Sequence, residues 1–165
     1  DVILENADRL EHKVKSLLYL NRLDYLSAEE SELKPFPIKD LIEHIVMQME
    51  AMQHIHIETD LDDVAFIGNE EHWRVAIENI INASRYMKSV IKITLKEDTL
   101  IIYNDGDPID EDKKEDLFNP YVKGIKGQFG LGLSIVSKIA DMYGYDIHAE
   151  NKDIGVAFIF TKRAS

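Results

Sequence analysis

Apolar residues at the start of the chain recur with the spacing of a helix. Those separated alternately by four and three residues are Ile3, Ala7, Leu10, Val14 and Leu17. This heptad pattern predicts a helix over Val2–Leu26 with a seam for partner helices. Serine and acidic residues at Ser27–Glu32 then break the pattern. We place a domain boundary here, between a helical stalk (residues 1–31) and a globular domain (residues 32–165). A helix that packs on its own domain is the alternative.

Beyond this boundary, segments whose apolar residues have helical spacing alternate with segments that have the spacing of strands. Helical spacing predicts helices over Ile38–Gln53, Asn69–Met87 and Leu131–Tyr143. Alternation and short apolar runs predict strands over His54–Thr59, Val64–Ile67, Val90–Lys96, Thr99–Tyr103, Tyr145–Glu150 and Val156–Thr161. The stretch Asp105–Gln128 is rich in Gly, Pro and Lys and fits no core element. We therefore predict an α/β (α+β) two-layer sandwich, with a mixed sheet of about five strands and the three helices on one face.

Composition narrows the possible functions. With 19 basic and 31 acidic residues, the chain carries a formal net charge of −12. Such a charge disfavours binding to nucleic acids and to anionic membrane surfaces. The chain has no cysteine, which excludes disulfides, thiolate metal sites and cysteine nucleophiles. No apolar run approaches the ~20 residues of a membrane span. The start at Asp1, inside a helical pattern, suggests a piece of a longer protein.

Two polar segments accompany predicted helices. Gly127–Ser134 directly precedes the third one, where glycines allow close backbone approach and the first amides face an anion. By itself this is equally a tight turn, and its spacing matches neither a Walker nor a Rossmann loop. In the middle helix, Glu78 and Asn82 are four residues apart and share one face. Amide oxygens suit Mg²⁺ when phosphates supply the charge, although an exposed polar helix face is the simpler alternative.

Two further segments follow the predicted strand Thr99–Tyr103. Asn104–Ile109 lies at the strand end, where an Asn or Asp side chain can accept a hydrogen bond from an exocyclic amine. Its alternative is a plain turn. Leu117–Gly124 holds two aromatic residues before a basic stretch, and its alternative is an anchored surface loop.

In this order and spacing, the four segments resemble the N, G1, F and G2 boxes of the catalytic, ATP-binding domain of sensor histidine kinases. This family is grouped with gyrase, heat-shock chaperone and mismatch-repair ATPases. The resemblance covers almost the whole chain: Val2–Leu26 is similar to the second helix of the dimerisation and phosphotransfer hairpin, and Gly155 to the glycine before the final strand. It implies the cytoplasmic catalytic domain of a homodimeric, membrane-anchored protein with a response regulator as partner and ATP and Mg²⁺ as ligands.

The resemblance also assigns roles to residues. It implies catalytic roles for Glu78 and Arg85, with Arg85 at a phosphate, and Mg²⁺ coordination by Asn82. Asn104 falls on the acidic position that accepts the adenine amino group, and a slip of one place would put Asp105 there. The other implied nucleotide contacts are Asn79, Tyr86, Gly106, Ile109, Phe118, Tyr121, Lys123, Lys126, Gly127, Gly130, Leu131, Gly132 and Leu133.

The chain departs from the family pattern at two places. The family usually has two Asn residues four apart in the N box, whereas Asn79 and Asn82 are three apart. Without a gap, Glu78 takes the first position, as in the hydrolysing ATPases of the group. Whether Glu78 or Asn79 faces the nucleotide is left open, although helix geometry favours Glu78. In the G1 box, Pro108 replaces the second glycine. This stiffens the root of the mobile lid over the phosphates, in which the resemblance places Lys123 and Lys126.

None of the six histidines fits the phosphoacceptor pattern of the family. His12 lies on the first helix but is followed by Lys13 in place of an acidic residue. We expect His54 and His56 to share one polar strand face. The phosphoacceptor would then lie upstream of this chain, which would bind Mg-ATP and transfer the γ-phosphoryl group to it. The alternatives are a hydrolytic ATPase that uses Glu78 and a non-catalytic dimerisation or binding module.

Overall fold

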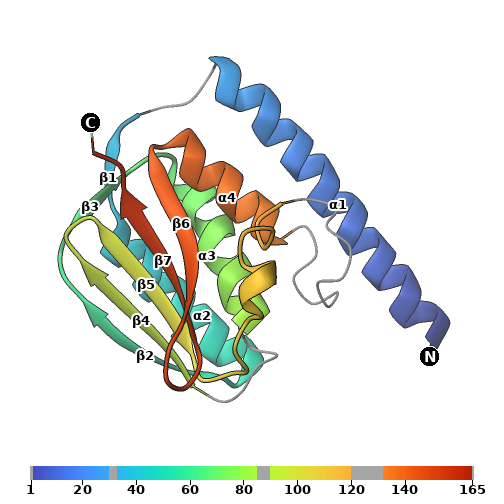
Figure 1. Ribbon diagram of the computed structural model, residues 1–165. Coiled ribbons are helices and arrows are strands. Elements are labelled where there is room, and N and C mark those ends of the chain that lie inside the picture. Colours follow the sequence, from blue (N-terminus) through green and yellow to red (C-terminus); the bar gives the residue numbers. More distant parts are fainter. Residues whose placement is uncertain (1, 30–32, 85–89, 120–131, 165) are drawn as a thin grey trace.

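The computed structural model of the chain describes residues 2–29, 33–84, 90–119 and 132–164 (Figure 1). Its main sheet has five strands in the order β2-β4-β5-β7-β6. These are β2 (His56–Leu61), β4 (Val90–Lys96), β5 (Thr99–Asn104), β6 (Tyr145–Asn151) and β7 (Val156–Lys162). β2 is parallel to β4, and the other neighbouring pairs are antiparallel.

Helices α2 (Ile38–Gln53), α3 (Glu70–Ser84) and α4 (Gly132–Met142) cover one face of this sheet, which confirms the predicted two-layer sandwich (Figure 1). Each helix turns an apolar stripe toward the strands, as its sequence period requires. In α3 the buried stripe includes Trp73, Ile77 and Ile80. Asn69 caps this helix, since its Oδ1 accepts hydrogen bonds from the backbone N–H groups of Glu71 (2.8 Å) and His72 (3.2 Å).

A second, two-stranded sheet pairs β1 (Pro35–Pro37) with β3 (Ala65–Ile67). The sequence predicted β3 but not β1, because β1 is only three residues long and includes two prolines. The small sheet joins the core through aromatic rings: Phe66 packs edge-on against Trp73, with ring centroids 5.3 Å apart. The indole Nε1 of Trp73 also donates to the carbonyl of Ile67 at 2.9 Å.

The strand predicted to begin at His54 begins instead at His56. His54 is the C-cap of α2 and has the left-handed backbone conformation, with φ of 55°. Because the helix ends in this kink, His54 and His56 do not share a strand face, and that expectation was wrong. His56 lies 3.4 Å from a carboxylate oxygen of Glu50.

Helix α1 (Val2–Glu29) extends past Ser27, where the sequence pattern breaks. Its C-terminal half packs on the body of the molecule, where it contacts α4 and buries Leu20 and Leu23. Its N-terminal half projects away from the body (Figure 1). The large apolar side chains exposed on this half are Val2, Ile3, Leu4, Leu10 and Val14. The helix therefore packs on the body at one end and keeps apolar side chains exposed toward the other. No helix in the described ranges has the length and hydropathy of a membrane span.

Candidate functional site

Three predicted site segments come together beside the main sheet. Helix α3, which carries Glu78, Asn79 and Asn82, packs against both β5 and α4. The strand β5 ends at Asn104, and α4 begins at Gly132. Segments that are distant in sequence are thus neighbours, because one helix packs on two other elements.

Asn79 of α3 lies directly against the first residue of α4. Its Nδ2 donates to the carbonyl of Val75 at 2.8 Å, one helical turn back. A Cβ atom on Gly132 would lie 2.9 Å from Asn79 Oδ1, so a larger residue at this position would displace the Asn79 amide. Of the two candidates for the first N-box position, Asn79 is therefore the one in contact with the start of α4.

Glu78 is half-buried beside a charged pair on the same helix. Burial raises the pKa of its carboxyl group, while Arg74 lowers it and Glu71 raises it further. Arg74 is itself engaged with Glu71, since its Nε lies 3.1 Å from a carboxylate oxygen. A carboxyl group with a raised pKa is suited to accepting a proton near neutral pH.

Asn104 is 1% exposed at the end of β5, and its amide is bound at both ends. Its Oδ1 accepts a hydrogen bond from the Gly106 N–H at 2.9 Å. Its Nδ2 donates to Ser84 Oγ at 3.3 Å, which ties the strand end to the last residue of α3.

Asp105, the alternative at this position, faces a different element. Its Oδ1 accepts a hydrogen bond from the Val90 N–H at 3.2 Å, and its own N–H donates to the Val90 carbonyl at 3.3 Å. Asp105 thus holds the start of β4, whereas Asn104 is directed toward α3.

Gly155 closes this corner from the β7 side. It has φ of +91°, and a Cβ atom there would overlap the carbonyl oxygen of Asn104 and come within 2.9 Å of the Cα of Asp105. The glycine that the sequence pattern singled out before the final strand is therefore packed against the turn after β5.

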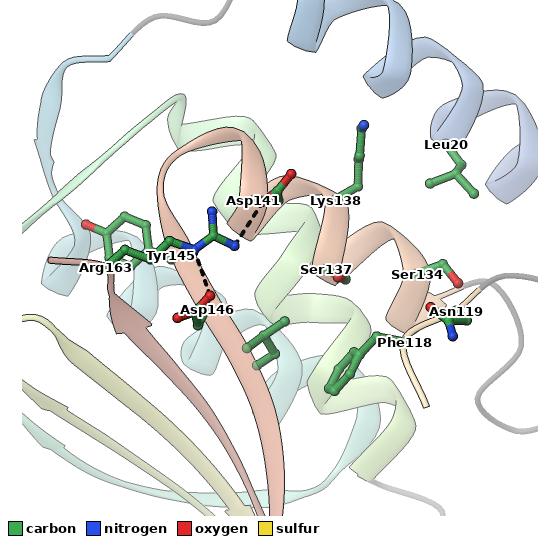
Figure 2. A pocket seen from close by; sticks show the side chains of 11 residues that line it. Leu20, Phe118, Asn119, Ser134, Ser137, Lys138, Asp141, Tyr145, Asp146 and Arg163 are labelled. Atoms are coloured by element: carbon green, nitrogen blue, oxygen red, sulfur yellow. Dashed lines mark hydrogen bonds and ion pairs between the residues drawn. The ribbon is translucent and has the colours of Figure 1, made fainter. Parts of the chain in front are cut away.

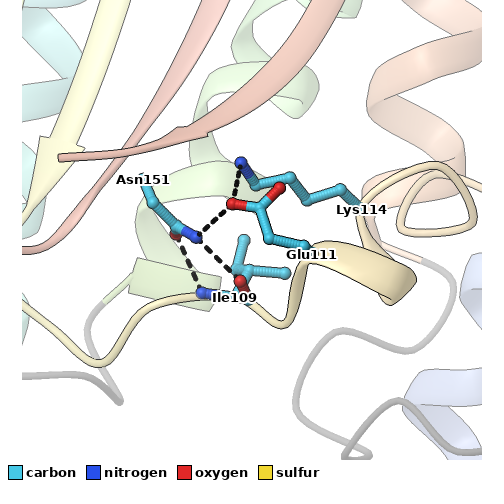
Figure 3. A network of polar contacts seen from close by, with 4 residues as sticks. All are labelled: Ile109, Glu111, Lys114 and Asn151. Carbon is cyan, nitrogen blue, oxygen red and sulfur yellow. Dashed lines mark hydrogen bonds and ion pairs between the residues drawn. The ribbon is translucent and has the colours of Figure 1, made fainter.

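Asn151, at the end of β6, fastens the segment that follows this turn (Figure 3). Its Oδ1 accepts from the Ile109 N–H at 2.9 Å, and its Nδ2 donates to the Ile109 carbonyl at 2.8 Å. Glu111, which begins the short 3₁₀ helix η1 (Glu111–Lys113), lies 3.4 Å from the same Nδ2 and bonds to Lys114. Asn151 and Ser84 could not be found from the sequence, because an isolated polar residue at the end of an element carries no distinctive spacing.

The remaining predicted site residues divide into three groups. Phe118 packs edge-on against Phe158, with centroids 6.5 Å apart, and Leu133 is fully buried, so both side chains contribute to the core. Gly106 is buried, and Asn82 is half-buried on α3. The residues that lie outside the described ranges are Arg85, Tyr86, Tyr121, Lys123, Lys126, Gly127, Gly130 and Leu131.

A pocket of about 410 Å³ lies between α1, α4 and β6 (Figure 2). Leu20, Ser134 and Lys138 line it, and Arg163 forms ion pairs with Asp141 (2.9 Å) and Asp146 (2.7 Å) at its edge. Phe118 is the one predicted site residue among the described residues that line it. This pocket is therefore distinct from the corner formed by Asn79, Asn104 and Gly132.

Comparison with known proteins identifies relatives of this arrangement. Residues 68–165 match the family described as "Histidine kinase-, DNA gyrase B-, and HSP90-like ATPase". The chain is 36% identical over 165 residues to the sensor histidine kinase CssS of Bacillus subtilis, which covers 96% of this chain and 37% of CssS. The chain thus spans well under half of this curated relative.

Two solved structures share the fold at appreciable identity. The catalytic domain of histidine kinase ThkA aligns with a TM-score of 0.69 and 29% identity, covering 78% of this chain and 94% of that domain. ThkA in complex with the response regulator TrrA aligns with a TM-score of 0.73 and 28% identity, covering 96% of this chain and 48% of that one.

Proposed function

The chain belongs to the histidine kinase-, DNA gyrase B- and HSP90-like ATPases, as a sensor histidine kinase ATPase domain, and from this premise we propose that it binds Mg-ATP and presents the γ-phosphoryl group to a histidine upstream. The observation that carries the proposal is the contact between Asn79 and Gly132. It brings the start of a helix, where backbone N–H groups favour phosphate, beside an amide-bearing helix face.

Within this proposal, the chain's polar groups hold and orient the nucleotide. Asn82, on the face of α3 shared with Glu78, would coordinate Mg²⁺ through its amide oxygen, which suits a hard cation. When bound, Mg²⁺ neutralises phosphate charge. Arg85, Lys123, Lys126 and the amides around Gly130–Gly132 would add to that neutralisation, which is the main requirement of phosphoryl transfer. Asn104 would accept a hydrogen bond from the adenine amino group.

We further propose that residues 1–31 belong to a dimerisation and phosphotransfer hairpin and residues 32–165 to the ATP-binding domain. The exposed apolar side chains on the N-terminal half of α1, such as Leu10 and Val14, support the first part, because such a stripe on a projecting helix favours packing with other helices. The full protein would then be a homodimer, anchored in the membrane with this domain in the cytoplasm. The complex of ThkA with TrrA supports a response regulator as the partner.

Thermal unfolding with and without Mg-ATP tests nucleotide binding. At a hundred times its dissociation constant, a ligand that binds only the folded state adds about 2.7 kcal/mol to the free energy of unfolding. Asn82→Ala should abolish the Mg²⁺-dependent part of the shift and leave the unliganded protein nearly as stable. A mutant with an unchanged Mg²⁺ response would remove Asn82 from this role.

The hydrolytic alternative rests on Glu78, whose raised pKa favours proton acceptance. If Glu78 activates water, Glu78→Gln should lower steady-state ATP turnover by roughly 10²-fold or more, the usual effect of losing a general base. A kinase that uses an acidic residue of the hairpin as its base should keep most of its phosphoryl transfer in this mutant. Measurement of phosphate release and of acid-labile phosphohistidine therefore separates the two enzymatic functions.

A further inference from the structure

Two buried polar side chains form a short hydrogen-bond chain at the end of β5. Ser84 and Asn104 are each 1% exposed. Ser84 Oγ donates to the carbonyl of Ile80 at 2.8 Å and accepts from Asn104 Nδ2 at 3.3 Å. At its other end, the Asn104 amide accepts from the Gly106 N–H at 2.9 Å.

Donor and acceptor chemistry determines which way the Asn104 amide points. A serine hydroxyl has a single proton, and here it is donated to the Ile80 carbonyl, so Ser84 can only accept from Asn104. The backbone N–H of Gly106 can only donate. The NH₂ group of Asn104 must therefore face Ser84, and its carbonyl oxygen must face Gly106.

We propose that Ser84 is a specificity-determining residue of the nucleotide site, which fixes Asn104 so that it prefers a purine with a 6-amino group over one with a 6-oxo group. The inference rests on the proposed function, in which Asn104 contacts the base. A carbonyl oxygen accepts two hydrogen bonds, and among the described residues Gly106 supplies one of them. The second lone pair would accept a hydrogen bond from a donor such as the adenine amino group.

This orientation matters because residue 104 is an asparagine. A carboxylate presents two equivalent acceptor oxygens, so a rotation of half a turn changes nothing. An amide that rotates by half a turn presents NH₂ in place of oxygen, and NH₂ would donate to a 6-oxo purine. Ser84 disfavours this rotated state, because a carbonyl oxygen facing Ser84 would meet no donor while the hydroxyl proton is held by Ile80.

The test compares the dissociation constants of Mg-ATP and Mg-ITP, which differ at the 6-substituent and the adjacent ring nitrogen. By isothermal titration calorimetry, wild type should bind ATP more tightly. Ser84→Ala should reduce the ATP-to-ITP affinity ratio roughly fivefold, the factor expected for the loss of one ordinary hydrogen bond. The loss is partial because the Gly106 N–H still favours the native orientation.

The decisive control is the same substitution in an Asn104→Asp background. There Ser84→Ala should leave the ATP-to-ITP ratio unchanged, because a carboxylate has no orientation to lose. A merely structural role of Ser84 would lower affinity for both nucleotides alike and would act in both backgrounds. If Ser84→Ala does not fold, Ser84→Cys keeps a similar volume and replaces the oxygen with a weak acceptor, and it should shift the ratio in the same direction.

The outcomes separate the two levels of the proposal. If Ser84→Ala lowers the ATP-to-ITP affinity ratio when residue 104 is Asn and leaves it unchanged in the Asn104→Asp background, the role of Ser84 is supported. If Ser84→Ala leaves the ratio unchanged, or lowers it equally in both backgrounds, the role of Ser84 is overturned. Tight ATP binding by wild type would still support the proposed function. An absence of saturable ATP binding by wild type overturns both.

Discussion

Gly132 lies directly against the Asn79 side chain: a Cβ atom on Gly132 would lie 2.9 Å from Asn79 Oδ1. This pair joins the first residue of α4 to α3, and it determines how closely the two helices approach at this corner. The atom in the way belongs to a side chain, and the Asn79 amide is held by its hydrogen bond to the Val75 carbonyl. A substitution at Gly132 therefore acts on Asn79 first.

We predict that Gly132→Ala is coupled to Asn79. In the wild-type background the new methyl group displaces the Asn79 amide, at a cost of about 1 kcal/mol for its hydrogen bond, which offsets the helix-forming advantage of alanine. In an Asn79→Ala background the obstacle is gone, and Gly132→Ala should raise the free energy of unfolding by up to about 1 kcal/mol. Chemical denaturation of the four proteins measures the coupling. Additive effects would contradict the contact.

Gly155 and Gly144 allow the cost of backbone strain to be separated from the cost of steric overlap, because both have positive φ but only Gly155 is crowded. Their φ angles are +91° and +81°, so alanine is strained at both positions. A Cβ at Gly144 meets nothing within 4 Å, whereas at Gly155 it meets the backbone of Asn104 and Asp105. Gly144→Ala should cost about 1 kcal/mol and Gly155→Ala at least about 2 kcal/mol more.

Urea denaturation at one temperature measures the difference between these two glycine variants. Because the overlap at Gly155 involves the carbonyl of Asn104, Gly155→Ala should also weaken ATP binding, whereas Gly144→Ala should not. Equal destabilisation by both variants would show that backbone conformation alone accounts for the glycine at position 155.

The next prediction concerns the two hydrogen bonds from Asn151 to the backbone of Ile109. Asn151→Ala should lower the free energy of unfolding by about 2 kcal/mol, the sum of two ordinary hydrogen bonds. It should also speed amide exchange at Ile109, which loses its acceptor. Asn119→Ala is the control, since Asn119 is exposed and bonds through Nδ2 to Asp116 only one turn away.

Asn151→Asp adds a finer test of the same clamp. A carboxylate can still accept from the Ile109 N–H but cannot donate to the Ile109 carbonyl, and it faces Glu111. In the Asn151→Asp variant, amide exchange at Ile109 should stay slow while the free energy of unfolding falls. Exchange at Ile109 that is equally fast in both Asn151 variants would show that the N–H bond does not anchor this segment.

The last prediction is a pH dependence centred on His72. Its Nδ1 lies 2.6 Å from the Tyr143 hydroxyl, in a half-buried contact where α1 packs on the body. Burial lowers the pKa of His72, the charge of Arg22 on α1 lowers it further, and Glu71 raises it. Tyr19, also on α1, completes this cluster, and burial followed by the influence of Tyr143 raises the pKa of its hydroxyl to about 12.

The sign of this effect follows from linkage. A lowered pKa means that the unfolded chain binds the proton more readily, so the contribution of His72 is complete above pH ~6.5 and is lost as the pH falls toward the folded-state value. The Tm should therefore drop between about pH 7.5 and pH 5.5 by up to about 3 °C more in wild type than in His72→Gln. The control, His44→Gln, removes an exposed histidine of α2 and should behave as wild type. Parallel curves for wild type and His72→Gln would contradict the assignment.

Local chemistry made most of the fold predictable from the sequence. The apolar period of Ile38–Gln53 reproduces α2 to the residue, and the register of β4 and β5 leaves Glu97 and Asp98 in the turn, as the alternation requires. The cap at Asn69 is equally local, because its side-chain oxygen accepts a hydrogen bond from a backbone N–H in the first turn of the same helix. The order of the four polar segments was likewise enough to identify the family.

Only the tertiary structure places Asn79, one of two adjacent polar residues, against the first residue of α4. Glu78 and Asn79 are equally polar in sequence, yet Asn79 contacts Gly132 because α4 packs on that side of α3. Asn104 is directed to Ser84 and Asp105 to Val90, since neighbouring residues at a strand end point to opposite sides. The bonds from Asn151 to Ile109 join residues 42 positions apart. Such contacts depend on how separate elements pack, which no local period encodes.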